Sequence, residues 1–201
     1  MPATVGTGYV VCAPMLIEQA AVVAGLRGSG VRVERTGMGR ARSARWARGV
    51  AGGGPVILLG VAGGVAAEVE PGDVIVAAAV SADGVDEVPC AAATEVAEAI
   101  RRLGLRTREG RIASCATLAA GTELVRRAQS GALAVDMESA YVAAEIGSRP
   151  LVVVRVITDT ATQPILRPSI VVRGVRALRT LRRIARTLPE WAGSIEASHG
   201  G

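Results

Sequence analysis

The stretch Leu151-Val-Val-Val-Arg-Val-Ile-Thr-Asp-Thr-Ala161 decides the fold class. Its first seven residues are apolar except for Arg155, and most of them are β-branched. Such a run is typical of a strand that is buried on both faces. It therefore indicates a sheet with helices packed on both of its sides.

Outward from this strand, apolar runs of strand length alternate with longer runs of helical period. Strands are expected at residues 9–13, 31–36, 56–59, 73–80, 111–115 and 133–135. Helices are expected at 16–24, 40–50, 94–103, 122–129, 137–146 and 168–188. This alternation predicts an α/β fold with one domain over residues 1–201, in three layers, α/β/α, around a mixed, largely parallel central sheet. Residues 190–201 are expected to form a loose tail.

The composition bounds the class of protein. Of the 201 residues, 50% are hydrophobic, which suits one compact core and excludes a disordered chain. Phe is absent and there are only two Trp and two Tyr, which argues against a surface on which nucleic-acid bases stack. No nucleic-acid partner is expected. The single histidine, His199, excludes Ser-His-Asp and Cys-His catalysis and most zinc sites. We expect no metal and no cofactor.

The charge of the chain leaves two interpretations open. All 23 basic residues are Arg, and the net charge is +5. This fits a partner that carries phosphate or a membrane surface, and it fits the codon composition of a GC-rich genome equally well. The three cysteines lack Cys-x-x-Cys spacing, and the first apolar stretch is interrupted by Pro14, Glu18 and Gln19. A cytoplasmic location without disulfides, signal peptide or membrane span is therefore expected.

Acidic residues follow several of the predicted strands, at the edge where ligands bind to parallel sheets. Glu138 follows the strand at 133–135, and its two oxygens can accept hydrogen bonds from a vicinal diol such as that of ribose. Alternatively, it begins a helix, where an acidic residue suits the dipole. Asp159 follows the strand at 151–157, where desolvation favours a protonated general acid. The alternative is that Asp159 caps the segment that follows.

Arg155 lies within an apolar strand, so it needs a carboxylate partner. Glu18, which follows the first strand, is the expected partner, and a purely structural pair is the alternative. Two glycine-rich segments, Thr36-Gly-Met-Gly39 and Gly60-Val-Ala-Gly-Gly64, also follow strands. Glycine lets the backbone approach a ligand closely there, although ordinary tight turns would use glycine too.

Two motifs, Ala134-Val-Asp-Met-Glu-Ser-Ala140 and Val154-Arg-Val-Ile-Thr-Asp-Thr-Ala161, carry a family resemblance. Together with the glycine run 60–64 and the segment Pro71-Gly-Asp-Val-Ile-Val76, they resemble the purine nucleoside phosphorylase and methylthioadenosine/S-adenosylhomocysteine nucleosidase superfamily. The resemblance covers residues 9–188. It implies an enzyme that cleaves the N-glycosidic bond of a purine nucleoside through an oxocarbenium-like transition state.

The resemblance also implies a role for each matched residue. Asp159 would act as the general acid at N7 of the base, with Thr158 beside it. Glu138 would hold the ribose diol, and Met137 would pack against the sugar. Glu18 would act as the general base that deprotonates an attacking water, and Arg155 would lie beside these acidic groups. The other implied substrate-binding residues are Asp136; Ala62 and Gly63, near the ribose or the nucleophile; and Leu118, along the purine base.

The sequence departs from the phosphorylase branch of this family, which usually has an Arg just before the glycine loop. Leu58 and Leu59 stand there, which favours water over phosphate as the nucleophile. Gly39, Arg40 and Arg42 could still supply a phosphate site. The lack of a histidine outside the tail favours a substrate whose 5′ group is apolar. A phosphate-dependent phosphorylase, a futalosine-type hydrolase and a non-catalytic nucleoside-binding protein stay open as alternatives.

The end of the chain resembles one branch more than others. Residues 156–161 and 164–191 resemble the hopanoid-associated branch, whose members resemble a phosphorylase that acts on adenosylhopane. In the terminal helix, arginines at 173, 176, 179, 183 and 186 recur along one face, and the other face has Val172, Val175, Leu178, Leu181 and Leu188. A basic amphipathic helix fits a peripheral membrane contact, and packing of its apolar face on the sheet is the alternative. The family resemblance also implies a homo-oligomer, at least a homodimer.

Overall fold

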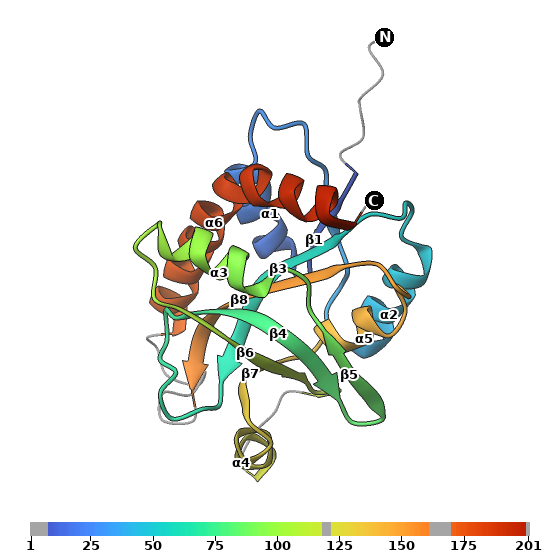
Figure 1. Cartoon of the computed structure of the whole chain (residues 1–201). Coiled ribbons are helices and arrows are strands. Elements are labelled where there is room, and N and C mark those ends of the chain that lie inside the picture. Colours follow the sequence, from blue (N-terminus) through green and yellow to red (C-terminus); the bar gives the residue numbers. More distant parts are fainter. Residues whose placement is uncertain (1–7, 118–121, 161–169, 200–201) are drawn as a thin grey trace.

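The computed structural model describes residues 8–117, 122–160 and 170–199 (Figure 1). The strands are β1 (Val10–Ala13), β2 (Val33–Arg35), β3 (Val56–Gly64), β4 (Val74–Ala82), β5 (Val85–Pro89), β6 (Thr107–Ser114), β7 (Ala132–Asp136) and β8 (Leu151–Thr160). The helices are α1 (Leu16–Gly25), α2 (Arg40–Gly49), α3 (Ala93–Arg101), α4 (Thr122–Gln129), α5 (Ser139–Ala143) and α6 (Ile170–His199). No helix in these described ranges is long and apolar enough to span a membrane.

The strands form one mixed, eight-stranded sheet in the order β2-β1-β3-β7-β6-β4-β5, and β8 pairs with both β3 and β4. β8 runs parallel to β3 from Leu151 onward and antiparallel to part of β4. The end of β3 pairs with β7, opposite Val135 and Ala134. Strands β3, β8, β4, β6 and β7 therefore close into a ring, a closure that the sequence patterns do not indicate.

Helices cover both faces of the sheet, as predicted for the α/β class (Figure 1). Alternate residues of β3 separate the two cores: Ile57 and Leu59 face α1, α3 and α6, and Val56 and Leu58 face α2 and α5. These side chains are completely buried, which explains why the strand is continuously apolar.

The glycine run at 60–64 forms the end of β3 instead of a loop. Its backbone pairs with β8 on one side and β7 on the other, so tertiary pairing overrides the low strand propensity of glycine. Strand β5, which was not predicted, forms a hairpin with β4.

The expected loose tail is wrong for residues 190–199. Helix α6 continues through Pro189 to His199, and Trp191, Ala192 and Ile195 are buried. These three residues continue the helical spacing of Leu181, Ile184 and Leu188 on the buried side, while Pro189 is exposed. Burial of that stripe carries the helix past the proline.

Candidate active site

A cleft of about 190 Å³ opens where β1, β3, β7 and β8 end. Eight of the predicted site residues line it: Glu18, Ala62, Gly63, Asp136, Met137, Glu138, Thr158 and Asp159. A smaller hollow of about 60 Å³ shares Gly63, Asp136, Met137 and Asp159 and reaches Leu124 of α4. Leu118 lies outside the described residues.

Asp159 is placed by an irregularity in the pairing of β3 with β8. The register shifts between Ala62 and Gly63, so Thr158 is passed over and Asp159 stands opposite Gly63. The Thr158 hydroxyl donates to Asp159 Oδ1 over 2.8 Å. A Cβ at Gly63 would lie 3.4 Å from Asp159 Oδ2, so a larger residue would crowd this carboxyl group.

Burial raises the pKa of Asp159, and the Thr158 hydrogen bond and the charge of Arg173 offset part of the rise. A carboxyl group with a raised pKa inside a cleft can donate a proton to a bound molecule.

Asp136 and Arg155 form a buried ion pair beneath the cleft. Arg155 Nε and Nη2 lie 2.9 and 2.7 Å from Asp136 Oδ2, and Arg155 is completely buried. Ser114 donates to Asp136 Oδ1 over 2.5 Å, and the Ser139 hydroxyl also donates to Asp136. Burial opposes ionisation of Asp136, but Arg155 and the two hydroxyls outweigh it and hold the pKa of Asp136 below its usual value.

The direct partner of Arg155 is thus Asp136, and the expected Arg155–Glu18 pair is wrong. Strand β7 brings Asp136 to the guanidinium, and the Glu18 carboxylate binds backbone amides instead. Glu18 Oε1 accepts from the Val61 amide and Oε2 from the Met15 amide, each over 2.7 Å. Burial raises the pKa of Glu18, although Arg155 and these amides offset part of the rise.

Gly60 lies between Arg155 and Glu18. A Cβ on Gly60 would lie 2.3 Å from Arg155 Nη1 and 3.0 Å from Glu18 Oε1. Arg155 Nη1 has no hydrogen-bond partner among the described residues. A buried cationic donor and a carboxylate oxygen therefore face the same narrow space over β3.

Glu138 reaches the cleft from the turn between β7 and α5. Its Oε1 accepts from the Gly39 amide over 2.8 Å, and its Oε2 lies 3.8 Å from Arg155 Nη2. Burial, together with the negative charge of Asp136, raises the pKa of Glu138 to about 7, and Arg155 offsets part of the rise. The carboxyl group is oriented by Gly39, with Met137 beside it in the cleft wall.

The structure does not bring the predicted phosphate-binding residues into the cleft. The Gly39 amide donates to Glu138. The exposed guanidinium of Arg40 lies over the Tyr141 ring, 5.4 Å from its centroid. Arg42 is exposed and packs against Gly37.

Met15 and Met38 line the cleft but are absent from the predicted site. Met15 directly precedes α1, and Met38 lies between Gly37 and Gly39 before α2. In the sequence, both follow a predicted strand and lie close to the predicted site residues Glu18 and Gly39, and this proximity is the signal that points to them. They add apolar side chains to the cleft wall.

The comparison with protein families decides the membership of the chain. A family model described as "Phosphorylase superfamily" matches residues 18–188. The chain belongs to the phosphorylase superfamily. Its sequence has no match among curated proteins.

Solved structures share the fold of this phosphorylase-superfamily enzyme. The 5′-methylthioadenosine/S-adenosylhomocysteine nucleosidase of Campylobacter jejuni has a TM-score of 0.78 at 16% identity and covers 92% of this chain and 100% of its own. The nucleosidase of S. pneumoniae, solved with a transition-state inhibitor, has a TM-score of 0.72 at 21% identity, and the match covers 90% of this chain and 99% of its own. A Streptococcus pyogenes S-adenosylhomocysteine nucleosidase in complex with 5-methylthiotubericidin has a TM-score of 0.71 at 21% identity, and the match covers 93% of this chain and 99% of its own. Likeness at these identities shows the fold.

Proposed function

We propose that this phosphorylase-superfamily enzyme hydrolyses the N-glycosidic bond of a purine nucleoside whose 5′ group is apolar. The observation that carries the proposal is the placement of three carboxyl groups, those of Asp159, Glu138 and Glu18, around one cleft. Each has a raised pKa and a different set of hydrogen-bond donors. Groups that differ in this way are suited to different steps of one reaction.

In the proposed reaction, protonated Asp159 donates its proton to N7 of the base as the bond from C1′ to N9 breaks. Ionised Glu138 accepts hydrogen bonds from the 2′- and 3′-hydroxyl groups while the sugar becomes oxocarbenium-like. Glu18 accepts a proton from water, whose oxygen bonds to C1′. The products are the free base and the sugar with its 5′ group, and proton transfer of this kind contributes about 100- to 10,000-fold in rate.

Electrostatics favours water over phosphate as the nucleophile. Arg155, the buried cation beneath the cleft, is shared by Asp136 and Glu138, with Glu18 nearby, and the charge of Arg173 acts on Asp159. An incoming phosphate would therefore meet net negative charge. Arg40 and Arg42, which would supply positive charge, lie outside the cleft lining.

The 5′ side of the substrate is proposed from the two methionines. Met15 and Met38 are polarisable apolar side chains that adapt to different shapes. Methylthio groups suit them, and the solved relatives include complexes with a methylthio nucleoside analogue. Met38 is 51% exposed and Leu16, beside Met15, is 63% exposed, so a longer chain of the adenosylhopane type would find an apolar rim.

The test is release of adenine from a panel of adenosine analogues, with and without phosphate. The panel contains 5′-methylthioadenosine, S-adenosylhomocysteine, adenosine, an aminofutalosine and a long-chain 5′-alkyl adenosine. We expect release without phosphate and a preference for apolar 5′ groups. Release only with phosphate would overturn hydrolysis, and release from no member would overturn the catalytic proposal.

Asp159→Asn separates catalysis from binding. We expect turnover to fall about 100-fold or more, because the amide can donate a hydrogen bond but cannot transfer a proton to the base, while an uncleavable analogue still binds. Asp86→Asn, at an exposed aspartate on β5, is the matched control. Full activity of Asp159→Asn would refute the general-acid role.

A further inference from the structure

Exposed apolar side chains are concentrated on two neighbouring helices. Large hydrophobic residues exposed on α1 and α6 are Leu16, Ile17, Val23, Val171, Val172 and Val175, with exposed fractions between 44% and 69%. Among the described residues, the others are Met38, at the cleft, and Val125, on α4. Core packing explains Leu181 and Leu188 of α6, which are buried, but it does not explain these valines.

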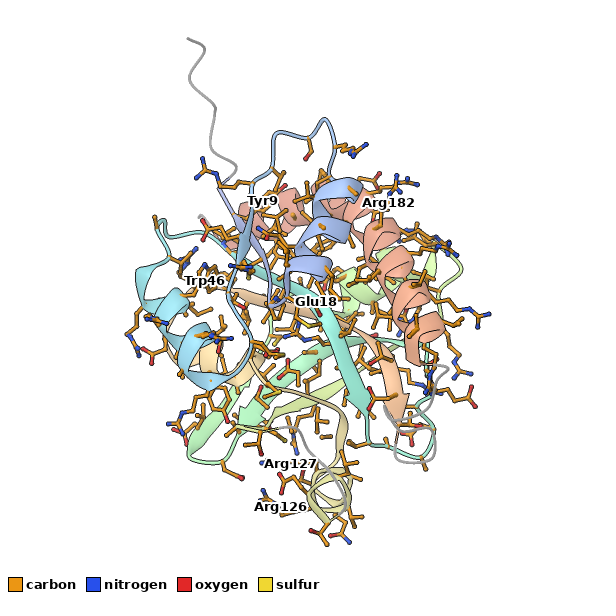
Figure 2. The ribbon with its side chains drawn as sticks, turned by 180° about the vertical axis from the view of Figure 1, so that it is seen from behind. Tyr9, Glu18, Trp46, Arg126, Arg127 and Arg182 are labelled. Carbon is orange, nitrogen blue, oxygen red and sulfur yellow. The ribbon has the colours of Figure 1, made fainter. Side chains whose placement is uncertain are left out.

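Helices α1 and α6 lie side by side on the face of the molecule that Figure 2 shows, with Glu18 near one end of α1. A Cβ on Gly25 would lie 2.5 Å from the Arg182 carbonyl oxygen, so the backbones are in close contact at that level. Both helices follow strands that run parallel to β3 and fold back over the sheet, so their first turns lie at the same edge. That edge is the one where the cleft opens.

Each helix shows the same change along its outward side. On α1, Leu16, Ala20 and Val23 are exposed, and Arg27 follows the helix. On α6, Val172 and Val175 are exposed at the start, and exposed arginines continue the same stripe at three- and four-residue spacing: Arg179, Arg182 and Arg186. The outward side is therefore apolar near the cleft and cationic away from it.

Among the described residues, acidic groups are few on α1 and α6 themselves; the exposed Glu95 and Glu98 lie on α3, which packs beside α6. The described acidic side chains of α1 and α6 are Glu18, which is buried, and Glu190, which lies toward the far end of α6. A surface of negative charge over an apolar interior complements both parts of the face.

We propose that the first turns of α1 and α6 dock on an anionic lipid bilayer. Leu16, Ile17, Val171, Val172 and Val175, the apolar end, enter the headgroup boundary, and Arg179, Arg182 and Arg186 contact lipid phosphates. Leu16 and Ile17 lie between Met15 and Glu18, which line the cleft. Docking therefore turns the cleft toward the bilayer. The docking proposal does not depend on the proposed reaction.

The test is cosedimentation of the ligand-free protein with vesicles of phosphatidylcholine, with and without phosphatidylglycerol. We expect binding to the anionic vesicles that weakens with salt. Val172→Ser/Val175→Ser should lower the affinity about tenfold without changing the charge, because it removes two side chains from the buried apolar area. Val125→Ser, at an exposed valine of α4, is the matched control and should bind like the wild type.

A second pair of variants tests the electrostatic part. Arg182→Gln should weaken binding to anionic vesicles and reduce its salt dependence, whereas Arg45→Gln on the opposite side, on α2, should not. Absence of binding to anionic vesicles, or unchanged binding by the valine variant, would overturn the proposal. It would also be overturned if sedimentation velocity showed a dimer that the valine variant abolishes.

Asp159→Asn keeps the two proposals separate, since it lies outside the docking face. It should bind vesicles like the wild type. Failure to bind lipid would leave N-glycosidic cleavage untouched, and failure of cleavage would leave the docking face untouched.

Discussion

Asp136 and Glu138 are two residues apart, yet their carboxyl groups meet opposite electrostatic environments. Asp136 takes the direct ion pair with Arg155 and two serine hydroxyls, which hold its pKa below the usual value. Glu138 accepts hydrogen bonds from the Gly39 and Met137 amides, and it lies 3.8 Å from the same Arg155 Nη2 that pairs with Asp136 at 2.7 Å. The buried Arg155 thus keeps Asp136 ionised at neutral pH, whereas the pKa of Glu138 stays at about 7.

The raised pKa of Glu138 makes stability depend on pH. The folded protein holds this proton up to a pH of about 7, whereas a free glutamate releases it near 4.5. The stabilisation is therefore complete below the free value and is lost as the pH rises toward 7. This pH-dependent loss of unfolding free energy amounts to about 3 kcal/mol, and we expect Glu138→Gln not to show it.

Thermal melts from pH 4 to 8 would measure this difference. Wild type should lose Tm relative to Glu138→Gln as the pH rises. Glu98→Gln, at an exposed glutamate of α3, should follow the wild type. Parallel curves for wild type and Glu138→Gln would contradict the interpretation.

At the scale of elements, the glycines of β3 leave the space that the buried side chains beside the strand occupy. Gly60 leaves room for Arg155 Nη1, which cannot retreat because Arg155 is completely buried. We expect Gly60→Ala to cost about 1–3 kcal/mol in free energy of unfolding. Adenine release should fall as well, because the displaced guanidinium no longer faces Glu18 and Glu138.

Chemical denaturation and the adenine-release assay would check Gly60→Ala together. Gly53→Ala is the matched control, since a Cβ there meets nothing within 4 Å. An active and fully stable Gly60→Ala would mean that Arg155 can rearrange.

The last turns of α6 provide a second test at this scale. Trp191 is 6% exposed, and we expect Trp191→Ala to cost about 3 kcal/mol in free energy of unfolding, as large-to-small changes in a core do. Urea denaturation would measure the loss, with Glu190→Ala, at the exposed neighbour, as the control. A nearly neutral Trp191→Ala would restore the expectation of a loose tail.

For the whole molecule, local sequence patterns predicted the helices and strands better than they predicted which strands pair with each other. Helix α4 was predicted with the bounds that it has, because its polar and apolar residues repeat locally. The ring closure between β3 and β7 has no local signature. The need of Arg155 for a carboxylate was readable from its apolar strand, but the choice of Asp136 over Glu18 depends on how distant strands align.

The same holds for the candidate site. Asp159, Glu138 and Glu18 were predicted from strand ends, and the structure brings them to one cleft. Met15 and Met38 were missed because an apolar residue beside a strand end is indistinguishable from a core residue until the chain is folded. Their roles, like those of the carboxyl groups, stay predictions for the assays above.

The ring of strands is joined unevenly. β3 and β8 are paired along the whole of β3, whereas β3 meets β7 only at its last residues, Gly63 and Gly64. This seam has only two paired positions, so we expect it to open more readily than the long pairing of β3 with β8. Asp136 and Asp159 lie on its two sides. A molecule bound between them would therefore hold the ring of strands closed, so we expect opening of this seam to accompany release of product.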